Sequence, residues 1–428
     1  MQLILGFLFV FQLQILQNKS LKNLSDSLYL AHLINYEGLE AGSEGNFKDA
    51  TEKFYYALKL LPKFHEAQLN LQIISDYENE IINYTQTKQL LYSALQLNRH
   101  KYADAESILE ELVKELPKYY PLFIIQGKTY LRLKKYILGA KVLTQASIDQ
   151  PINPYIFYCR AQLNHANSNL FGAIEDFSTA IFLDSVYADA YWGRGLVWRD
   201  LNDLDQSIMD FETALSLNPL YANFLEESLQ IFESYNNRGI QFLKAGKYHQ
   251  SISDFNRALE FNTQFSEPLI NLGTAYRNLH EYDKALSCYM KAARIDSVNP
   301  NVFLNRGIFY KETKQFDLAI EDFQKVISLN SDNSDAYYNL GEIHFAKNNY
   351  ENAIYYFKKA INANENHVWS HYWLALSYDN IKKWDKAINS YQNFIDYAPE
   401  IYYEHRLKAA ERLRRLKKWL IKHKFNKQ

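Results

Sequence analysis

The chain has 428 residues, of which 47% are apolar and 15% aromatic, so it can bury a continuous core and its composition argues against disorder. Only 14 Gly and 9 Pro are present, which is too few turn-forming residues for an all-β fold of this length. The formal net charge is −2, so no overall positive charge draws the protein to nucleic acid.

The first residues, MQLILGFLFVFQLQILQNKS, are apolar from Leu3 to Val10 and mixed from there to Leu16. This run is shorter than the roughly 20 residues of a membrane span, and it resembles the core of a secretory signal peptide. It lacks a basic residue in front and an A-x-A cleavage site behind. We expect residues 1–18 to direct export to the periplasm, the cell envelope or the medium. An uncleaved membrane anchor is one alternative, and a buried first helix of a cytoplasmic protein is another.

From residue 31 onward a 34-residue unit repeats. One copy covers 31–64, four copies cover 86–221 without a gap, and five cover 232–401. Positions 8 and 20 of every copy are small, position 24 is large and apolar, and position 27 is usually Ala. Small residues at 8 and 20 let two antiparallel helices approach closely, and the large residue at 24 fills the gap to the next helix pair. Each unit leaves one apolar face bare until a neighbour covers it, so stability comes from stacking.

Five copies carry proline at position 32, which ends the second helix because proline cannot continue it. Together these positions match the tetratricopeptide repeat, and the chain resembles that family over ten copies of 34 residues, 340 of its 428. The resemblance implies an all-α fold, a right-handed α-solenoid of about ten helix-turn-helix repeats.

Two segments, 65–85 and 222–231, interrupt the repeats. Both lack Gly and Pro, so we expect each to be helical, to lengthen the first helix that follows, and to bend the solenoid into segments.

Residues 402–428 hold ten Lys or Arg against two Glu. They continue as a helix with an apolar side formed by Leu407, Ala410, Leu413, Leu416 and Leu420. We expect this basic helix to cap the open face of the last repeat. Its basic side, like the N-terminal segment, is also suited to a weak contact with membrane lipid.

Arginine occupies position 7 in four copies, and aspartate occupies position 23 of the same four copies. None of the other six copies has either residue there. The pairs are Arg160 with Asp176, Arg194 with Asp210, Arg238 with Asp254, and Arg306 with Asp322. A buried ion pair that loses one partner costs roughly 3–5 kcal/mol, so this pattern of both or neither predicts contact within each hairpin. An arginine row that binds phosphate or carboxylate is the functional alternative.

First helices of this family line the concave side of the solenoid, with positions 2, 5, 6, 9, 12 and 13 facing inward. Position 6 of four successive copies is asparagine: Asn237, Asn271, Asn305 and Asn339. An amide offers donors and an acceptor to a peptide backbone, so the resemblance implies a track for an extended peptide. A solvated consensus residue is the alternative.

The tenth copy has Trp373 at position 6, with aromatic neighbours at inward positions: Tyr338, Trp369 and Tyr372. Aromatic side chains on a concave surface make good binding anchors, although aromatics in repeat proteins more often pack in the core.

The sequence contains no HExxH, Cys-x-x-Cys, Gly-rich phosphate loop or G-x-S-x-G motif. We therefore expect no catalytic residues, no cofactor and no metal site. Outside the basic tail the chain holds 37 Lys or Arg against 47 Asp or Glu, a surplus that would repel nucleic acid. The sequence predicts a non-catalytic scaffold that binds an extended segment of a protein partner in its concave groove. The alternative is a structural subunit of a larger complex that contacts partners by its edges.

Overall fold

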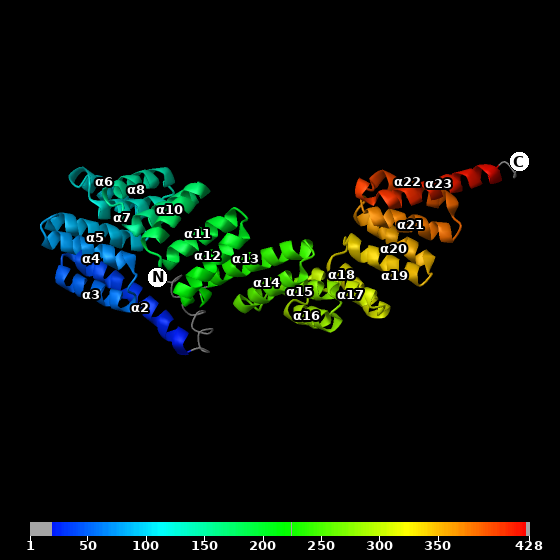
Figure 1. Ribbon diagram of the computed structural model, residues 1–428, viewed down its shortest axis with the longest axis horizontal. Helices are drawn as coiled ribbons and strands as arrows, with labels where there is room; N and C mark the ends of the chain where they lie inside the picture. Colours follow the sequence, from blue (N-terminus) through cyan, green and yellow to red (C-terminus); the bar gives the residue numbers. More distant parts are fainter. Residues whose placement is uncertain (1–18, 224, 425–428) are drawn as a thin grey trace. The chain divides into compact units, whose positions relative to one another are not determined.

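The computed structural model describes residues 19–223 and 225–424 (Figure 1). These residues form 22 α-helices, two short 3-10 helices and no β-strand, so the predicted all-α fold is confirmed. The chain divides into two compact units, residues 1–237 and 238–428, and the division falls inside one long helix, α13 (Leu225–Lys244).

In the first unit, five antiparallel hairpins follow one another, and we call the first helix of each hairpin A and the second B. The A–B pairs are α2 (Lys19–Glu44) with α3 (Phe47–Leu60), α5 (Tyr84–Asn98) with α6 (Tyr102–Glu115), α7 (Tyr120–Arg132) with α8 (Tyr136–Asp149), α9 (Pro154–Ala166) with α10 (Leu170–Leu183), and α11 (Ala188–Asp200) with α12 (Leu204–Leu217). A single helix, α4 (His65–Glu78), lies between the first two pairs, and a 3-10 helix, η2 (Pro219–Asn223), follows the last.

After α13, the second unit continues as α14 (Tyr248–Phe261) and four further hairpins. These are α15 (Glu267–Asn278) with α16 (Tyr282–Ile295), α17 (Pro300–Glu312) with α18 (Phe316–Leu329), α19 (Ser334–Ala346) with α20 (Tyr350–Ala363), and α21 (Val368–Asn380) with α22 (Trp384–Tyr397). A 3-10 helix, η3 (Glu400–Tyr402), then leads into the last helix, α23 (Tyr403–Lys424). The helix boundaries recur with the 34-residue period of the sequence.

Position 8 is small because the side chain at position 24 lies on it. A Cβ atom added to Gly307 would stand 2.7 Å from Cε1 of Phe323, and one added to Gly341 would stand 2.5 Å from Cε1 of Phe357. Both phenylalanines are completely buried. The ring at position 24 therefore packs on the backbone of its own A helix. The sequence pattern had suggested instead that this ring fills the gap to the next helix pair.

The predicted ion pairs are confirmed. In each of the four hairpins the arginine Nε and Nη2 atoms donate to the two carboxylate oxygens of the aspartate, over distances of 2.6 to 2.9 Å. Asp210, for example, is 1% exposed. A third donor of Arg194, Nη1, bonds Ser178 Oγ on the preceding B helix at 3.0 Å. The arginines thus hold each hairpin together, Arg194 also links its hairpin to the preceding one, and the four guanidinium groups are not free to form a ligand row.

The first insert differs from expectation. It does not lengthen the following A helix, because α4 ends at Glu78 and α5 begins separately at Tyr84. Asn83 starts α5 with a capping box: its side chain accepts a hydrogen bond from Gln86 N, and the Gln86 side chain accepts one from Asn83 N. This box satisfies backbone donors that a continuous helix would bond internally. In the second insert, residues 225–231 are continuous with the next A helix in α13.

The last helix, α23, packs against α22 through Ala409, Leu413 and Leu416, which are all buried. Two residues of the predicted apolar side are exposed, Leu407 and Ala410. The buried side follows the spacing 409, 413, 416, which places position 410 about 100° away around the helix. Arg412 also fixes α23 to α21, because its Nε and Nη2 donate to both carboxylate oxygens of Asp379 at 2.7 and 2.8 Å.

Candidate interaction surface

The four asparagines of the predicted row differ from one repeat to the next in their exposure and in their hydrogen bonds. Asn237 is exposed and Asn271 is half-buried, and the Nδ2 atom of Asn271 is buried without a hydrogen-bond partner among the described residues. Asn305 and Asn339 instead donate to the carbonyl groups of Asn301 and Asp335, each four residues earlier. The four side-chain amides are therefore not equally accessible to a ligand.

Asn339 is 5% exposed because a neighbouring repeat covers it. Lys311 on α17 donates from Nζ to Asn339 Oδ1 at 2.6 Å and to Glu342 Oε2 at 2.5 Å. Glu342 also accepts a hydrogen bond from Tyr338 Oη at 2.6 Å. The side chain of Asn339 thus links successive A helices, and the binding role predicted for this row remains a prediction.

The four predicted aromatic anchors fall into two groups. Trp369 and Tyr372 are half-buried and pack close to the chain that follows the last hairpin: the ring of Trp369 lies 4.9 Å from Tyr402 and 5.0 Å from His405. Tyr338 lies one repeat earlier, on α19, whereas Trp373 lies on α21 beside Tyr372. Trp373 packs edge-on against Phe345 at 4.9 Å.

Trp373 lines a hollow of about 240 Å³ in the second unit, together with Lys311, Phe316, Glu342, Ile343, Phe345 and Ala346. Most of these residues occupy inward positions 6, 9, 12 and 13 of three successive repeats. Trp373 is thus a predicted anchor that the structure places in a hollow.

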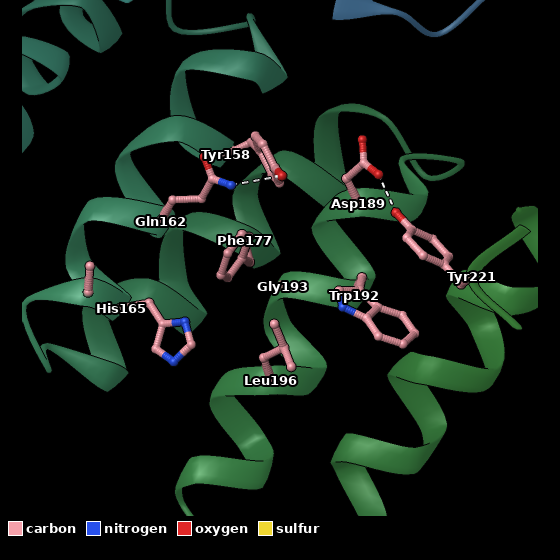
Figure 2. Close-up of a pocket in the computed structure, with 10 residues that line it drawn as sticks. Tyr158, Gln162, His165, Phe177, Asp189, Trp192, Gly193, Leu196 and Tyr221 are labelled. Atoms are coloured by element: carbon pink, nitrogen blue, oxygen red, sulfur yellow. Dashed lines mark hydrogen bonds between the residues drawn. The ribbon is translucent and has the colours of Figure 1, made fainter. Parts of the chain in front are cut away.

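A larger hollow, of about 400 Å³, lies on the first unit between α9 and α11 (Figure 2). Its lining is Tyr158, Gln162, His165, Ala166, Phe177, Asp189, Trp192, Gly193, Leu196 and Tyr221. Eight of these ten residues stand at inward positions 2, 5, 6, 9, 12 or 13 of their repeats. Sequence reasoning missed this surface because it followed the asparagine pattern of the later copies, although the same position rule applied to the earlier ones.

The first unit curves back on itself, which makes this surface concave. Lys63, just before α4, pairs with Asp184 at 2.6 Å across 121 residues of sequence. Lys128 on α7 pairs with Glu66 on α4 at 2.6 Å and also donates to Tyr155 Oη at 3.0 Å. Burial in the protein acts to raise the pKa of Glu66, but the ammonium group of Lys128 lowers this pKa to about 2. Helix α4 is thereby anchored to the inner face.

His65 begins α4 and packs between two tyrosines. Its ring stacks on Tyr155 with centroids 5.1 Å apart and lies 4.4 Å from the ring of Tyr187. Its Nδ1 contacts Gln68 Oε1 at 3.1 Å, and its Nε2 is buried without a partner among the described residues. Burial lowers the pKa of His65 below its ordinary 6.5, although nearby Glu66, Asp189 and Asp184 act to raise it.

We predict that the first unit loses stability as the pH falls below 6.5. The folded state favours neutral His65, so the unfolded chain takes up the proton at a higher pH, and stability is lost between 6.5 and the lowered pKa of the folded state. Glu66 acts in a different window, because its contribution is lost only below pH 4.5. Urea unfolding at pH 7.5 and 5.0 measures the loss of stability, and amide hydrogen exchange of residues 65–78 shows whether α4 is affected. His65→Phe keeps an aromatic ring and removes the titration, so it should show the smaller loss, and an equal loss would contradict the assignment.

Within residues 19–223 and 225–424, no cluster of three or more His, Cys, Asp or Glu is placed to hold a metal ion. Over the same residues, no helix combines the length and the hydropathy that crossing a membrane requires. Residues 1–18, which carry the predicted signal or anchor, lie outside the described part of the chain.

Comparisons with known proteins agree with the repeat pattern. A family model described as tetratricopeptide repeat matches residues 188–219 and 266–299, and one described as anaphase-promoting complex, cyclosome, subunit 3 matches residues 312–394. The comparison with curated protein sequences gave no match.

Several solved structures are similar in fold. The C-terminal part of a TPR repeat-containing protein from Cytophaga hutchinsonii is 15% identical, with a TM-score of 0.46 over 59% of this chain and 99% of that one. Yeast Tom70 is 16% identical, with a TM-score of 0.42 over 91% and 96%. PilF of Pseudomonas aeruginosa is 21% identical, with a TM-score of 0.39 over 44% and 93%. The family-model matches identify tetratricopeptide repeats at residues 188–219 and 266–299, and the 34-residue helical hairpins of the described residues continue the same pattern.

Proposed function

We propose that the protein is a non-catalytic scaffold that binds an extended segment of a partner protein along the inward faces of its A helices. One observation carries this proposal. The hollow in each unit is lined mainly by the same inward positions of successive repeats, although the two sets of side chains differ in chemistry. A surface that repeats along successive A helices suits a ligand that is itself extended.

The groups on this face match that use. Asn237 is exposed on this face, and Trp192 and Trp373 line the two hollows. The arginine row is excluded as a ligand site because its guanidinium groups are held by aspartates of their own hairpins.

Affinity capture followed by quantitative mass spectrometry tests this proposal. The bait is the full chain, compared with two variants: N271A/N305A/N339A on the inward face, and W192A in the larger hollow. A matched control, N256A/N389A/N393A, removes three exposed asparagines of B helices. We expect partners to be lost with the inward variants and retained with the control, and unchanged capture by both inward variants would refute the proposal.

A second candidate, a structural subunit that contacts partners by its edge, is favoured by exposed apolar side chains near the ends of α8 and α10. Phe182 is 86% exposed and Ile152 is 77% exposed, and Ile148 and Val186 occupy the equivalent positions of the neighbouring repeat. Contiguous exposed apolar side chains often mark interaction sites. Loss of partners with Phe182→Ser and Ile152→Ser, and not with the inward variants, would favour this candidate.

Export to the periplasm or cell envelope belongs to the same proposal and is supported by the apolar run from Leu3 to Leu16 alone. N-terminal sequencing of the mature protein tests it. A mature chain that starts near residue 19 supports export, and an intact Met1 in a cytoplasmic fraction contradicts it.

A further inference from the structure

The hollow between α9 and α11 is walled by aromatic rings. Trp192 stacks on Tyr221 with centroids 4.6 Å apart and an interplanar angle of 16°. Tyr158 and Phe177 form the opposite side, with centroids 5.9 Å apart, and Figure 2 shows Gly193 between the two sides. Aromatic faces carry partial negative charge and attract cations.

One carboxylate of this hollow, Asp189, lies near His65 and His32 but forms no ion pair within the described residues. Asp189 Oδ1 accepts a hydrogen bond from Tyr221 Oη, and no Lys or Arg of the described residues pairs with it. The other acids nearby are occupied: Glu66 by Lys128, Asp184 by Lys63, and Asp200 by His165 and Arg199. The Asp189 side chain reaches solvent, but the protein packed around it removes part of its hydration and so raises its pKa above the ordinary value.

The charge of the surrounding unit has the same sign as this carboxylate. Residues 1–237 hold 19 Lys or Arg against 28 Asp or Glu, so an anionic ligand would meet repulsion here. An apolar side chain would desolvate Asp189 without compensation, which is costly for an ionised group. A positively charged side chain would avoid both the repulsion and the uncompensated desolvation of Asp189.

We propose that this hollow receives one positively charged side chain, arginine or lysine, from an extended segment of the partner. This inference rests on the proposed function and adds the chemistry of the ligand. Asp189 would pair with the charged group, while Tyr158 and the small exposed part of Trp192, which packs between Tyr221 and Phe211, would contact the side chain. The volume of about 400 Å³ is near the lower end of the roughly 300–1,000 Å³ of small-ligand pockets, which suits one long side chain.

The chain itself shows the same combination elsewhere. Arg194 lies 5.7 Å from the ring centre of Tyr191 while it pairs with Asp210, and Arg160 lies 5.4 Å from the ring centre of Phe157 while it pairs with Asp176. A guanidinium between an aromatic ring and an aspartate is therefore a stable arrangement in this fold.

The test follows Trp192 in the full-length protein labelled with 5-fluorotryptophan. The chain has six tryptophans, and Trp192→Phe identifies the resonance of Trp192. The probes are N-acetyl-arginine methylamide, the corresponding lysine compound, the uncharged citrulline compound and the glutamate compound. We expect the Trp192 resonance to shift in a saturable way with arginine or lysine, and at least tenfold more weakly with citrulline and glutamate.

Asp189→Asn removes the charge and keeps an oxygen that can accept from Tyr221, so it should weaken arginine binding at least tenfold with an unchanged thermal unfolding midpoint. Glu175→Gln removes an exposed acid from α10 outside the hollow, and should change nothing. Equal shifts with arginine and citrulline, or unchanged binding by Asp189→Asn, would overturn the inference. A saturable shift with the glutamate or citrulline compound alone would overturn it while leaving the proposed function intact, because the hollow would still bind a side chain.

Discussion

Asp322→Ala is expected to lower the free energy of unfolding of the second unit by about 3–5 kcal/mol, because it leaves a largely buried guanidinium without its carboxylate. Asp322 is 5% exposed and accepts hydrogen bonds from Arg306 Nε at 2.8 Å and Nη2 at 2.7 Å. After the substitution, few neighbours can replace those acceptors, since the third donor of Arg306 faces Met290 Sδ.

Another hairpin of the chain shows which residues a double variant should carry to compensate for the lost ion pair. The last hairpin has Leu374 and Ser390 where this one has Arg306 and Asp322, and both are buried there. The double variant R306L/D322S copies that uncharged pair, so it should recover most of the loss caused by either single substitution. Urea unfolding of the wild type, both single variants and the double variant forms the cycle. A double variant whose loss equals the sum of the two single losses would show that the pair is not coupled.

Phe323→Ala is expected to cost about 3–5 kcal/mol, the usual range for a fully buried phenylalanine. The ring is 0% exposed and lies directly on the Cα of Gly307, where even a methyl group would collide with it. Its removal leaves a cavity that the closely packed hairpin cannot collapse to fill.

The matched control for this prediction is Tyr355→Ala on the next B helix. Tyr355 is 54% exposed, and a surface substitution of this kind usually changes stability by less than about 0.5 kcal/mol. Thermal and urea unfolding of both variants measures the difference. If the two substitutions cost the same, position 24 would not be the packing centre of the hairpin.

The hairpins and their ion pairs were predictable because both depend on contacts at a fixed spacing within one repeat. Arg306 and Asp322 are 16 residues apart, as are the other three pairs, so co-occurrence within the period was enough to reveal contact. The small residues at position 8 were predictable for the same reason.

Contacts between repeats were harder to predict, because they depend on long side chains that reach across the stack. Lys311 bonds Asn339 from 28 residues away and so covers one member of the asparagine row. Trp369 packs near η3 and the start of α23 through Tyr402 and His405, which lie beyond the last repeat. The separate helix α4 had a local signal, the Asn83 and Gln86 capping box, which lies outside the repeat pattern.

The larger hollow could be recognised only from the folded structure. Its residues come from α9, α10, α11 and η2, and Tyr221 lies 63 residues after Tyr158. Their inward positions followed from the repeat pattern, but the isolation of Asp189 from any described Lys or Arg did not, because it depends on which neighbouring charges are already paired.

Site-specific photo-crosslinking tests most directly whether the inward face of the A helices is the binding surface. Benzoylphenylalanine would replace Leu196 or Ala346, which line the two hollows, or Phe182, which is exposed on the edge of α10. The full-length variants would be irradiated in the presence of captured partners. We predict crosslinks to a partner from positions 196 and 346 and none from 182, whereas crosslinks from 182 alone would contradict the account.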